Sequence, residues 1–213
     1  GGIYQVANSK DNSEEDTNGY PNTGDELTFN PYYNNSIGIR FRNVNIPQGA
    51  EVTEAYLEFT AYSTRTYGSG SMRIRGVADD DADDFHPNRR NRINNLPKTS
   101  GLTWSMPDFY SNRDYQSPNI AAIVKEITDR SGWASGNDMA FVLDNFSSYR
   151  GAYSYGGSPS KAPRLIIKFN GSATPGSSAT VREHLISKVD ELSANGLTPI
   201  VDTLLEATNY YGG

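Results

Sequence analysis

The sequence predicts a mainly β fold, an antiparallel β-sandwich of the jelly-roll kind that carries one short amphipathic helix. The hydrophobic fraction is only 36%, while the 213 residues include 20 Gly, 11 Pro and 14 Tyr. This composition is typical of many short strands that are joined by turns and expose polar faces. Several segments also alternate apolar and polar residues, which is the pattern of a strand with one buried face. The chain is long enough to bury a sizeable core.

Seven segments are predicted as strands, because apolar residues alternate in them or form a short buried run. They are residues 3–6, 37–41, 52–61, 72–78, 102–105, 139–143 and 163–169. Pro47 and Gly49 mark a turn after the second of these segments. We expect the strands at 37–41, 52–61 and 72–78 to pair with one another as a meander. The polar passage at residues 8–25 is predicted as a loop.

One helix is predicted between the strands at 102–105 and 139–143. Its apolar face is formed by Ile120, Ile123, Val124 and Ile127, which follow the i, i+3, i+4, i+7 spacing. Ser117 is placed to cap the N-terminus, and Pro118 suits the first helical position. Gly132 is placed to end the helix in the left-handed conformation. We therefore expect a short helix that docks on a sheet.

Charge and composition argue against several classes of function. The net charge of -6 argues against a nucleic-acid partner, which requires a basic surface. No apolar run approaches the roughly 18 residues needed to cross a bilayer. The chain has no cysteine, and its two histidines, His86 and His184, are far apart in the sequence. Since no nucleophile or phosphate-loop motif is present either, we do not expect an enzyme.

The order of features resembles a known kind of module. Residues 37–61 (IGIRFRNVNIPQGAEVTEAYLEFTA) and residues 154–169 (SYGGSPSKAPRLIIKF) flank the predicted helix. Together, over residues 3–169, they resemble a β-sandwich module of bacterial secreted proteins. Such modules look like carbohydrate-binding jelly rolls and occur in surface proteins related to type IV pilus tip adhesins. The resemblance implies an extracellular location on the bacterial surface and a surface glycan or protein as ligand.

Two acidic passages contain candidate metal ligands. The candidates are Asp11, Glu14, Glu15 and Asp25 in the first passage and Asp79, Asp81 and Asp83 in the second. Carboxylate oxygens are the ligands that Ca²⁺ prefers, so calcium is the expected ion. The alternative is a pair of solvated acidic loops, the second screened by the arginines that follow it. A catalytic carboxylate pair is least favoured, because a contiguous Asp run supplies no asymmetry of environment.

Aromatic residues are the candidate ligand-binding platform, because aromatic rings stack on the C–H faces of sugars. The candidates are Trp104, Tyr110, Tyr115, Tyr149, Tyr153 and Tyr155. The alternative is that Trp104 belongs to the core and that its neighbours cover it.

The composition changes near residue 172, which predicts a domain boundary. Residues 1–172 form the predicted β-sandwich binding module, and residues 173–180 form a Gly/Ser/Pro/Thr linker. Residues 181–213 are predicted as a two-helix appendage, which is too small for a core of its own and is expected to pack on the remainder of a larger surface protein, on a neighbouring subunit or back on the sandwich. This segment resembles a fragment of a von Willebrand factor A domain, which implies that Thr198 is a metal ligand. The alternative is that Thr198 caps a helix that Pro199 begins.

Three functions are compatible with these observations. The first is a non-catalytic binding or adhesion module of a bacterial surface or pilus-associated protein, stabilised by calcium. The second is a carbohydrate-binding module of a secreted hydrolase, which shares the fold and differs in its partner domain. The third is a structural subunit of an extracellular filament.

Overall fold

The strands of the structure form antiparallel layers. This computed structural model describes residues 1–32, 36–85 and 91–170. The chain divides into two units, Gly1–Ser172 and Ala173–Gly213. The predicted linker, the two-helix appendage and Thr198 lie outside the described residues, so everything below concerns the first unit.

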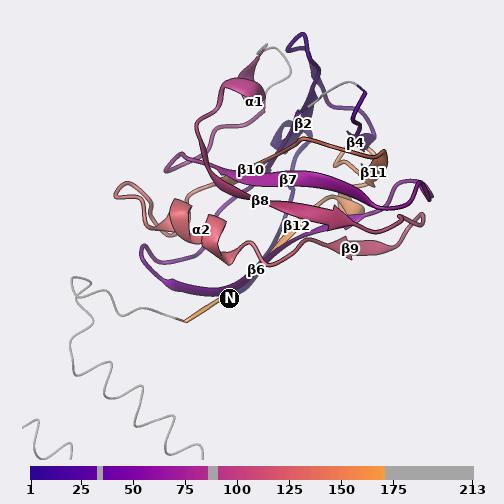
Figure 1. Cartoon of the computed structure of the whole chain (residues 1–213). Coiled ribbons are helices and arrows are strands. Elements are labelled where there is room, and N and C mark those ends of the chain that lie inside the picture. Colours follow the sequence, from indigo (N-terminus) through magenta and orange to yellow (C-terminus); the bar gives the residue numbers. More distant parts are fainter. Residues whose placement is uncertain (33–35, 86–90, 171–213) are drawn as a thin grey trace, which may run out of the picture. The chain divides into compact units, whose positions relative to one another are not determined.

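One layer is a six-stranded sheet with the order β3-β2-β5-β10-β7-β8, drawn across the upper part of Figure 1. Its strands are β2 (Asn12–Glu15), β3 (Pro21–Asn22), β5 (Ser36–Phe41), β7 (Gly70–Val77), β8 (Lys98–Met106) and β10 (Met139–Asp144). The central strand β10 pairs with β5 on one side and with β7 on the other. All six residues of β10 are buried, as expected for a strand that is covered on both faces.

The facing layer is a four-stranded sheet with the order β1-β12-β6-β9. Its strands are β1 (Gly2–Gln5), β6 (Glu51–Thr60), β9 (Asp114–Gln116) and β12 (Arg164–Asn170). A third, two-stranded sheet pairs β4 (Glu26–Phe29) with β11 (Arg150–Tyr153). Every strand pair in the described part of the chain is antiparallel, so the predicted mainly β sandwich is confirmed.

The predicted meander is wrong. β5 and β7 lie in the six-stranded sheet, where β10 separates them, while β6 lies in the other sheet. Alternation shows that each strand has one buried face, but it does not show which sheet that face belongs to. The chain therefore crosses from one layer to the other and back between residues 41 and 70.

Helix α2 (Ala121–Thr128) lies at one end of the two sheets and contacts β6, β7 and β8. Its apolar face is the predicted one, since Ile120, Ile123, Val124 and Ile127 are buried. Its limits differ from the prediction. Ser117 does not cap the helix, because its hydroxyl accepts a hydrogen bond from the backbone N–H of Leu57 in β6. Gly132 is not left-handed, and the helix ends at Thr128, with Asp129 as the residue that caps it.

The core between the layers is aromatic at the end opposite α2. Phe29 makes edge or stacked contacts with Phe59, Phe109 and Phe146, with ring centroids 5.5, 6.4 and 5.6 Å apart. Trp104 stacks on Phe59 at 6.0 Å. Buried aromatic pairs of this kind add about 0.5–1.5 kcal/mol each to the area that they bury.

A smaller apolar cluster covers the outer face of the six-stranded sheet. It contains Val77, Ala82, Phe85, Ile93, Ala140 and Val142. The segment that follows β7 and the short helix α1 (Arg92–Asn95) supply its outer half. This cover explains why both faces of β10 are buried.

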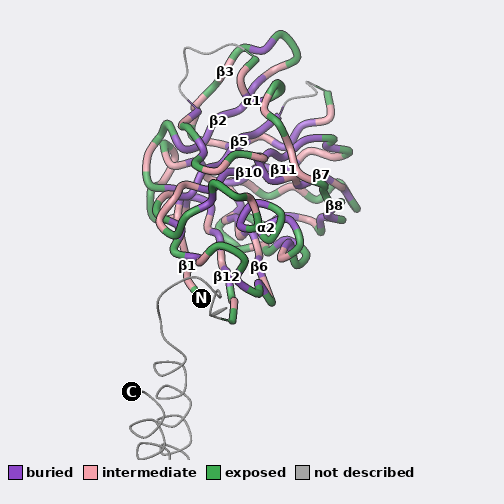
Figure 2. Tube along the Cα trace, turned by 90° about the vertical axis from the view of Figure 1, so that its left-hand side faces the viewer, coloured by how far each residue is buried: buried purple, intermediate pink, exposed green. Residues whose placement is uncertain are grey.

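The prediction of a loop over residues 8–25 is wrong at β2 and at β3, which pair with each other within it. After a 3-10 turn η1 (Ser9–Asp11), β2 pairs with β5 and all four of its residues, NSEE, are buried. Figure 2 shows this buried stretch beside β5. A second 3-10 turn, η2 (Pro159–Lys161), precedes β12.

Candidate functional site

Three loops meet at the aromatic end of the sandwich and border an open cavity of about 560 Å³. We call this cavity the tyrosine groove. It is lined by Pro31, Tyr32, Arg65, Tyr67, Ser147, Ser148 and Tyr149. Pro31 and Tyr32 follow β4, Arg65 and Tyr67 lie between β6 and β7, and the last three residues precede β11. Segments that are far apart in the sequence therefore build one site.

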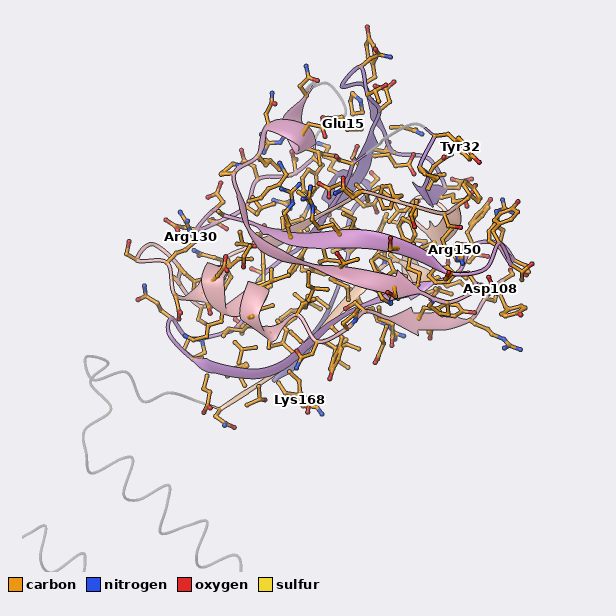
Figure 3. All side chains as sticks on the ribbon, in the orientation of Figure 1. Glu15, Tyr32, Asp108, Arg130, Arg150 and Lys168 are labelled. Carbon is orange, nitrogen blue, oxygen red and sulfur yellow. The ribbon has the colours of Figure 1, made fainter. Side chains whose placement is uncertain are left out.

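Tyr32 and Tyr67 provide the groove with exposed aromatic surface. Their side chains are 88% and 68% exposed, which makes them two of the five most exposed large hydrophobic residues described. Figure 3 shows Tyr32 projecting outward from the end of the sandwich where Arg150 and Asp108 also lie. An exposed ring can accept a ligand on its face without displacing a protein neighbour.

Arg65 and Tyr149 form a polar pair in the groove. The guanidinium carbon of Arg65 lies 4.5 Å from the centroid of the Tyr149 ring, within the range of a cation–π contact. The Tyr149 hydroxyl accepts a hydrogen bond from Arg65 at 3.4 Å and donates one to Glu26 at 3.3 Å. Burial raises the pKa of Tyr149 and that of Glu26, while the hydrogen bond to Tyr149 raises the pKa of Arg65. Arg65 is therefore charged throughout the physiological range.

Arg150 fixes the loops beneath the groove. This side chain is completely buried and donates hydrogen bonds to the backbone oxygens of Pro107, Gly68 and Tyr149. It also donates to Ser148 Oγ and pairs with Asp108 at 3.3 Å. Gly68 has φ +78°, a conformation that favours glycine. One buried cation thus joins two groove loops to the segment after β8.

The six predicted ligand-binding aromatics are not gathered in one place. Tyr149 alone lines the groove. Trp104 is 4% exposed and belongs to the core, as the alternative interpretation expected, and Tyr115 stacks on Phe109 at 4.1 Å. Tyr110 lies under Arg113, with 5.1 Å between the ring centroid and the guanidinium carbon.

The other two predicted tyrosines also lie outside the groove. Tyr153 contacts Tyr62 and Lys161, and Tyr155 packs against the core. The sequence prediction missed Tyr32, Tyr67 and Arg65. Gly68 and Gly70 do indicate a loop beside Tyr67 in the sequence. No local pattern, however, shows that this loop lies near Tyr32 in the fold.

The predicted metal ligands of the first acidic passage do not gather at one site, because they contact different residues of the protein or lie in solvent. Asp11 is buried and pairs with Arg40 and Arg42. Glu15 accepts hydrogen bonds from the backbone N–H groups of Ile93 and Asn94 at 3.0 and 2.9 Å, so it caps the start of α1. Asp25 is exposed.

Glu14 lies at a second, smaller cavity of about 330 Å³, which also contains Asp16, Tyr20, Pro21, Asn22, Thr28 and Asn30. Its carboxylate accepts a hydrogen bond from the backbone N–H of Thr28. Burial raises the pKa of Glu14 to about 7, and the nearby Glu26 adds to this effect. A proton on Glu14 near neutral pH is therefore one consequence of its position.

The second acidic passage is held by scattered contacts. Asp79, Asp81 and Asp83 are exposed, and Asp83 pairs with Arg92 at 3.1 Å. Asp81 accepts a hydrogen bond from the backbone N–H of Asp138. Within residues 1–32, 36–85 and 91–170, no three acidic or histidine side chains come together in a way that could hold a metal ion. The carboxylates of the described residues thus do not form a calcium-binding cluster in this structure.

No protein-family model matches the chain, and no curated protein matches it either. Among the described residues, no helix has both the length and the apolar character to cross a membrane.

Proposed function

We propose that the chain is a non-catalytic extracellular binding module of a bacterial surface or pilus-associated protein, and that it binds a surface glycan in the tyrosine groove. The observation that carries this proposal is the groove itself. Two exposed tyrosines, Tyr32 and Tyr67, line one cavity of about 560 Å³ together with Arg65, which is stacked on Tyr149. Sugars offer C–H faces that stack on aromatic rings and hydroxyls that hydrogen-bond to charged groups. The bacterial and extracellular parts of the proposal rest on the family resemblance of residues 3–169.

The groove is suited to binding because contacts within the protein already hold its side chains and loops in place. Arg65 is stacked on Tyr149, and Arg150 fastens the loops from below. A site that is already ordered loses less conformational entropy when it binds. The exposed rings of Tyr32 and Tyr67 then supply contact area at low cost, since tyrosine has only two side-chain rotations to fix.

Binding of the full chain to an array of bacterial and host-surface glycans tests the proposal, with each hit measured by calorimetry. Tyr67→Ala and Tyr32→Ala are expected to weaken the binding of a hit about tenfold, since an aromatic contact contributes about 0.5–1.5 kcal/mol beyond the area that it buries, and about 1.4 kcal/mol is a factor of ten. Tyr110→Ala is the matched control, because Tyr110 is exposed and lies under an arginine outside the groove. Equal losses in all three variants, or no bound glycan, would contradict the proposal.

Calcium stabilisation stays a prediction from the acidic passages, and a thermal melt of the full chain with and without chelator tests it. An ion present at a hundredfold excess over its Kd adds about 2.7 kcal/mol to the free energy of unfolding. We expect the chelator to lower the midpoint by several degrees and calcium to restore it. An unchanged midpoint would mean that the acidic passages hold no calcium ion that contributes to stability.

A further inference from the structure

We propose that the ligand of the tyrosine groove is an acidic glycan, one that contains uronic acid residues, and that Arg65 selects it by pairing with a ligand carboxylate. This inference rests on the function proposed above, because it names the chemical class of the glycan.

The first support is that Arg65 forms no ion pair in the described part of the chain; the carboxylate that attracts it from nearby, Glu26, is hydrogen-bonded to Tyr149 instead. Ten arginines lie in the described part of the chain, and eight of them form an ion pair with an Asp or Glu. The two others are Arg65 and Arg113, and of these only Arg65 lines a cavity described here. A protein with a net charge of -6 offers many acidic side chains to its arginines. The absence of an ion pair at Arg65 therefore marks this guanidinium as available.

The second support is the number of N–H groups that Arg65 leaves unused. A guanidinium carries five donors in a fixed fork. Arg65 donates to the backbone oxygen of Thr64 at 3.2 Å and to the Tyr149 hydroxyl at 3.4 Å, both weak contacts. Its Nε also has no hydrogen-bond partner among the described residues, but this atom is buried, so a ligand can be reached only by the two terminal nitrogens. Arg150, which lies beneath the same groove, donates five hydrogen bonds. Its donors are therefore used by the protein, whereas most of those of Arg65 are not.

The third support is that Arg65 is nevertheless held in place. Its guanidinium lies over the Tyr149 ring, and Glu26 fixes the Tyr149 hydroxyl from the other side. A planar guanidinium matches a carboxylate with two parallel hydrogen bonds, and pre-ordering reduces the entropy that this pairing costs. Uronic acids combine such a carboxylate with a pyranose ring, which can stack on Tyr67 or Tyr32. The groove thus contains a partner for each half of an acidic sugar.

The test compares two probes that share one backbone. Oligogalacturonate carries free carboxylates, and its fully methyl-esterified form carries none. With the full wild-type chain we expect the acid form to bind at least tenfold more tightly in calorimetry, and the difference to shrink as salt is added. Arg65→Met is expected to abolish this preference while it leaves binding of the ester unchanged. Arg65→Lys is expected to restore part of it, since lysine keeps the charge and loses the fork.

Arg113→Met is the matched control, because Arg113 also lies over a tyrosine and lacks a carboxylate partner but does not line the groove. It is expected to bind both probes like the wild type. A thermal melt of each variant shows whether it is folded.

The outcomes separate this inference from the proposed function. If acid and ester bind equally and Arg65→Met changes neither, while Tyr67→Ala weakens both, the groove binds glycans and the acidic class is wrong. If neither probe binds while the array yields a neutral glycan whose binding Tyr67→Ala weakens, the acidic class is wrong and the proposed function stands. If neither the probes nor any array glycan binds, the proposed function is wrong as well. Binding of a polyglutamate peptide as tight as that of the acid oligosaccharide, and independent of Tyr67, would overturn the glycan assignment in favour of an acidic protein.

Discussion

The buried carboxylate of Asp11 accepts hydrogen bonds from two nitrogens of Arg40, at 2.8 and 2.6 Å. Arg42 forms an ion pair with the same carboxylate at 2.8 Å, and Arg40 also reaches Asp138 at 3.1 Å. One carboxylate just before β2 thus holds Arg40 near the end of β5 and Arg42 just after it. Removing it leaves two cations beside each other with less compensation.

We therefore expect Asp11→Asn to lower the free energy of unfolding by about 3–5 kcal/mol, the usual cost of breaking a buried ion pair. Urea denaturation measures this loss. Asp129→Asn is the control, since Asp129 pairs with Lys125 on an exposed helix face and such pairs contribute about 0.3–0.5 kcal/mol. Similar losses in the two variants would show that the Asp11 network contributes no more than a surface pair.

Glu14 predicts a pH dependence of stability. Its pKa rises from 4.5 to about 7 on folding, so the folded state binds a proton that the unfolded state has released between these pH values. Stability contributed by this group is highest below pH 4.5 and falls as the pH rises to about 7, after which the loss is constant. The shift corresponds to a loss on the order of 3 kcal/mol.

Glu14→Gln removes the titrating proton and keeps an oxygen for the Thr28 N–H. Relative to the wild type, this variant is expected to gain stability as the pH is raised from 5 to 7.5. Urea denaturation at both pH values checks the prediction. A stability difference that does not change with pH would mean that Glu14 is ionised in the folded protein at both.

Arg150→Met is expected to loosen the groove loops and to lower the free energy of unfolding by about 3 kcal/mol. The substitution removes the donor for the backbone oxygens of Pro107 and Gly68, and a hydrogen bond from a charged group contributes about 1.5–3 kcal/mol. Hydrogen exchange should become faster at residues 66–70 and 147–149. In Arg130→Met, which removes an exposed pair with Asp80, exchange at these loops should remain as in the wild type. Unchanged exchange in Arg150→Met would contradict the role given to this residue.

Gly76 of β7 packs directly against α2, which leaves little room for a side chain at this position. A Cβ at this position would lie 2.7 Å from Ile127 Cδ1 and 3.0 Å from Ile123 Cγ2, which is closer than real contacts. Gly76→Ala is therefore expected to cost about 1–3 kcal/mol through overpacking. Ile127→Val removes the closest atom, so it should recover part of the loss in the Gly76→Ala background. An Ile127→Val change that only adds its own cost would show that the helix shifts instead.

Strands with an apolar face could be predicted from the sequence, but their sheet could not. β5, β6 and β7 lie close to the predicted segments, because alternation is a local property. β2 was missed because its residues are Asn, Ser and Glu. Their burial depends on partners far along the chain, such as the Ile93 N–H for Glu15 and the Tyr155 N–H for Asn12. A buried polar strand of this kind has no local signature.

The groove shows the same limit. Tyr149 could be proposed from the tyrosine-rich passage near β11, yet its partner Arg65 and the exposed Tyr32 come from two other loops. Only the arrangement of the sheets brings these loops together. Trp104 was an ambiguous residue for the opposite reason, since a large aromatic ring suits a sugar platform and a core equally well.

The pairing of β1 with β12 determines how the first unit responds to mechanical force. Gly2 lies opposite Ile167 and Gln5 lies opposite Arg164, so Gly1 and Asn170 lie at the same end of this antiparallel pair. Tension between these points acts across the strands and peels them apart one backbone hydrogen bond at a time, whereas tension along the strands would load all the bonds together. The unit should therefore begin to open at low force from its outermost strand, and force spectroscopy with handles at residues 1 and 172 would show a first extension equal to the release of β1. A first rupture that releases the whole unit at once would exclude this order of opening.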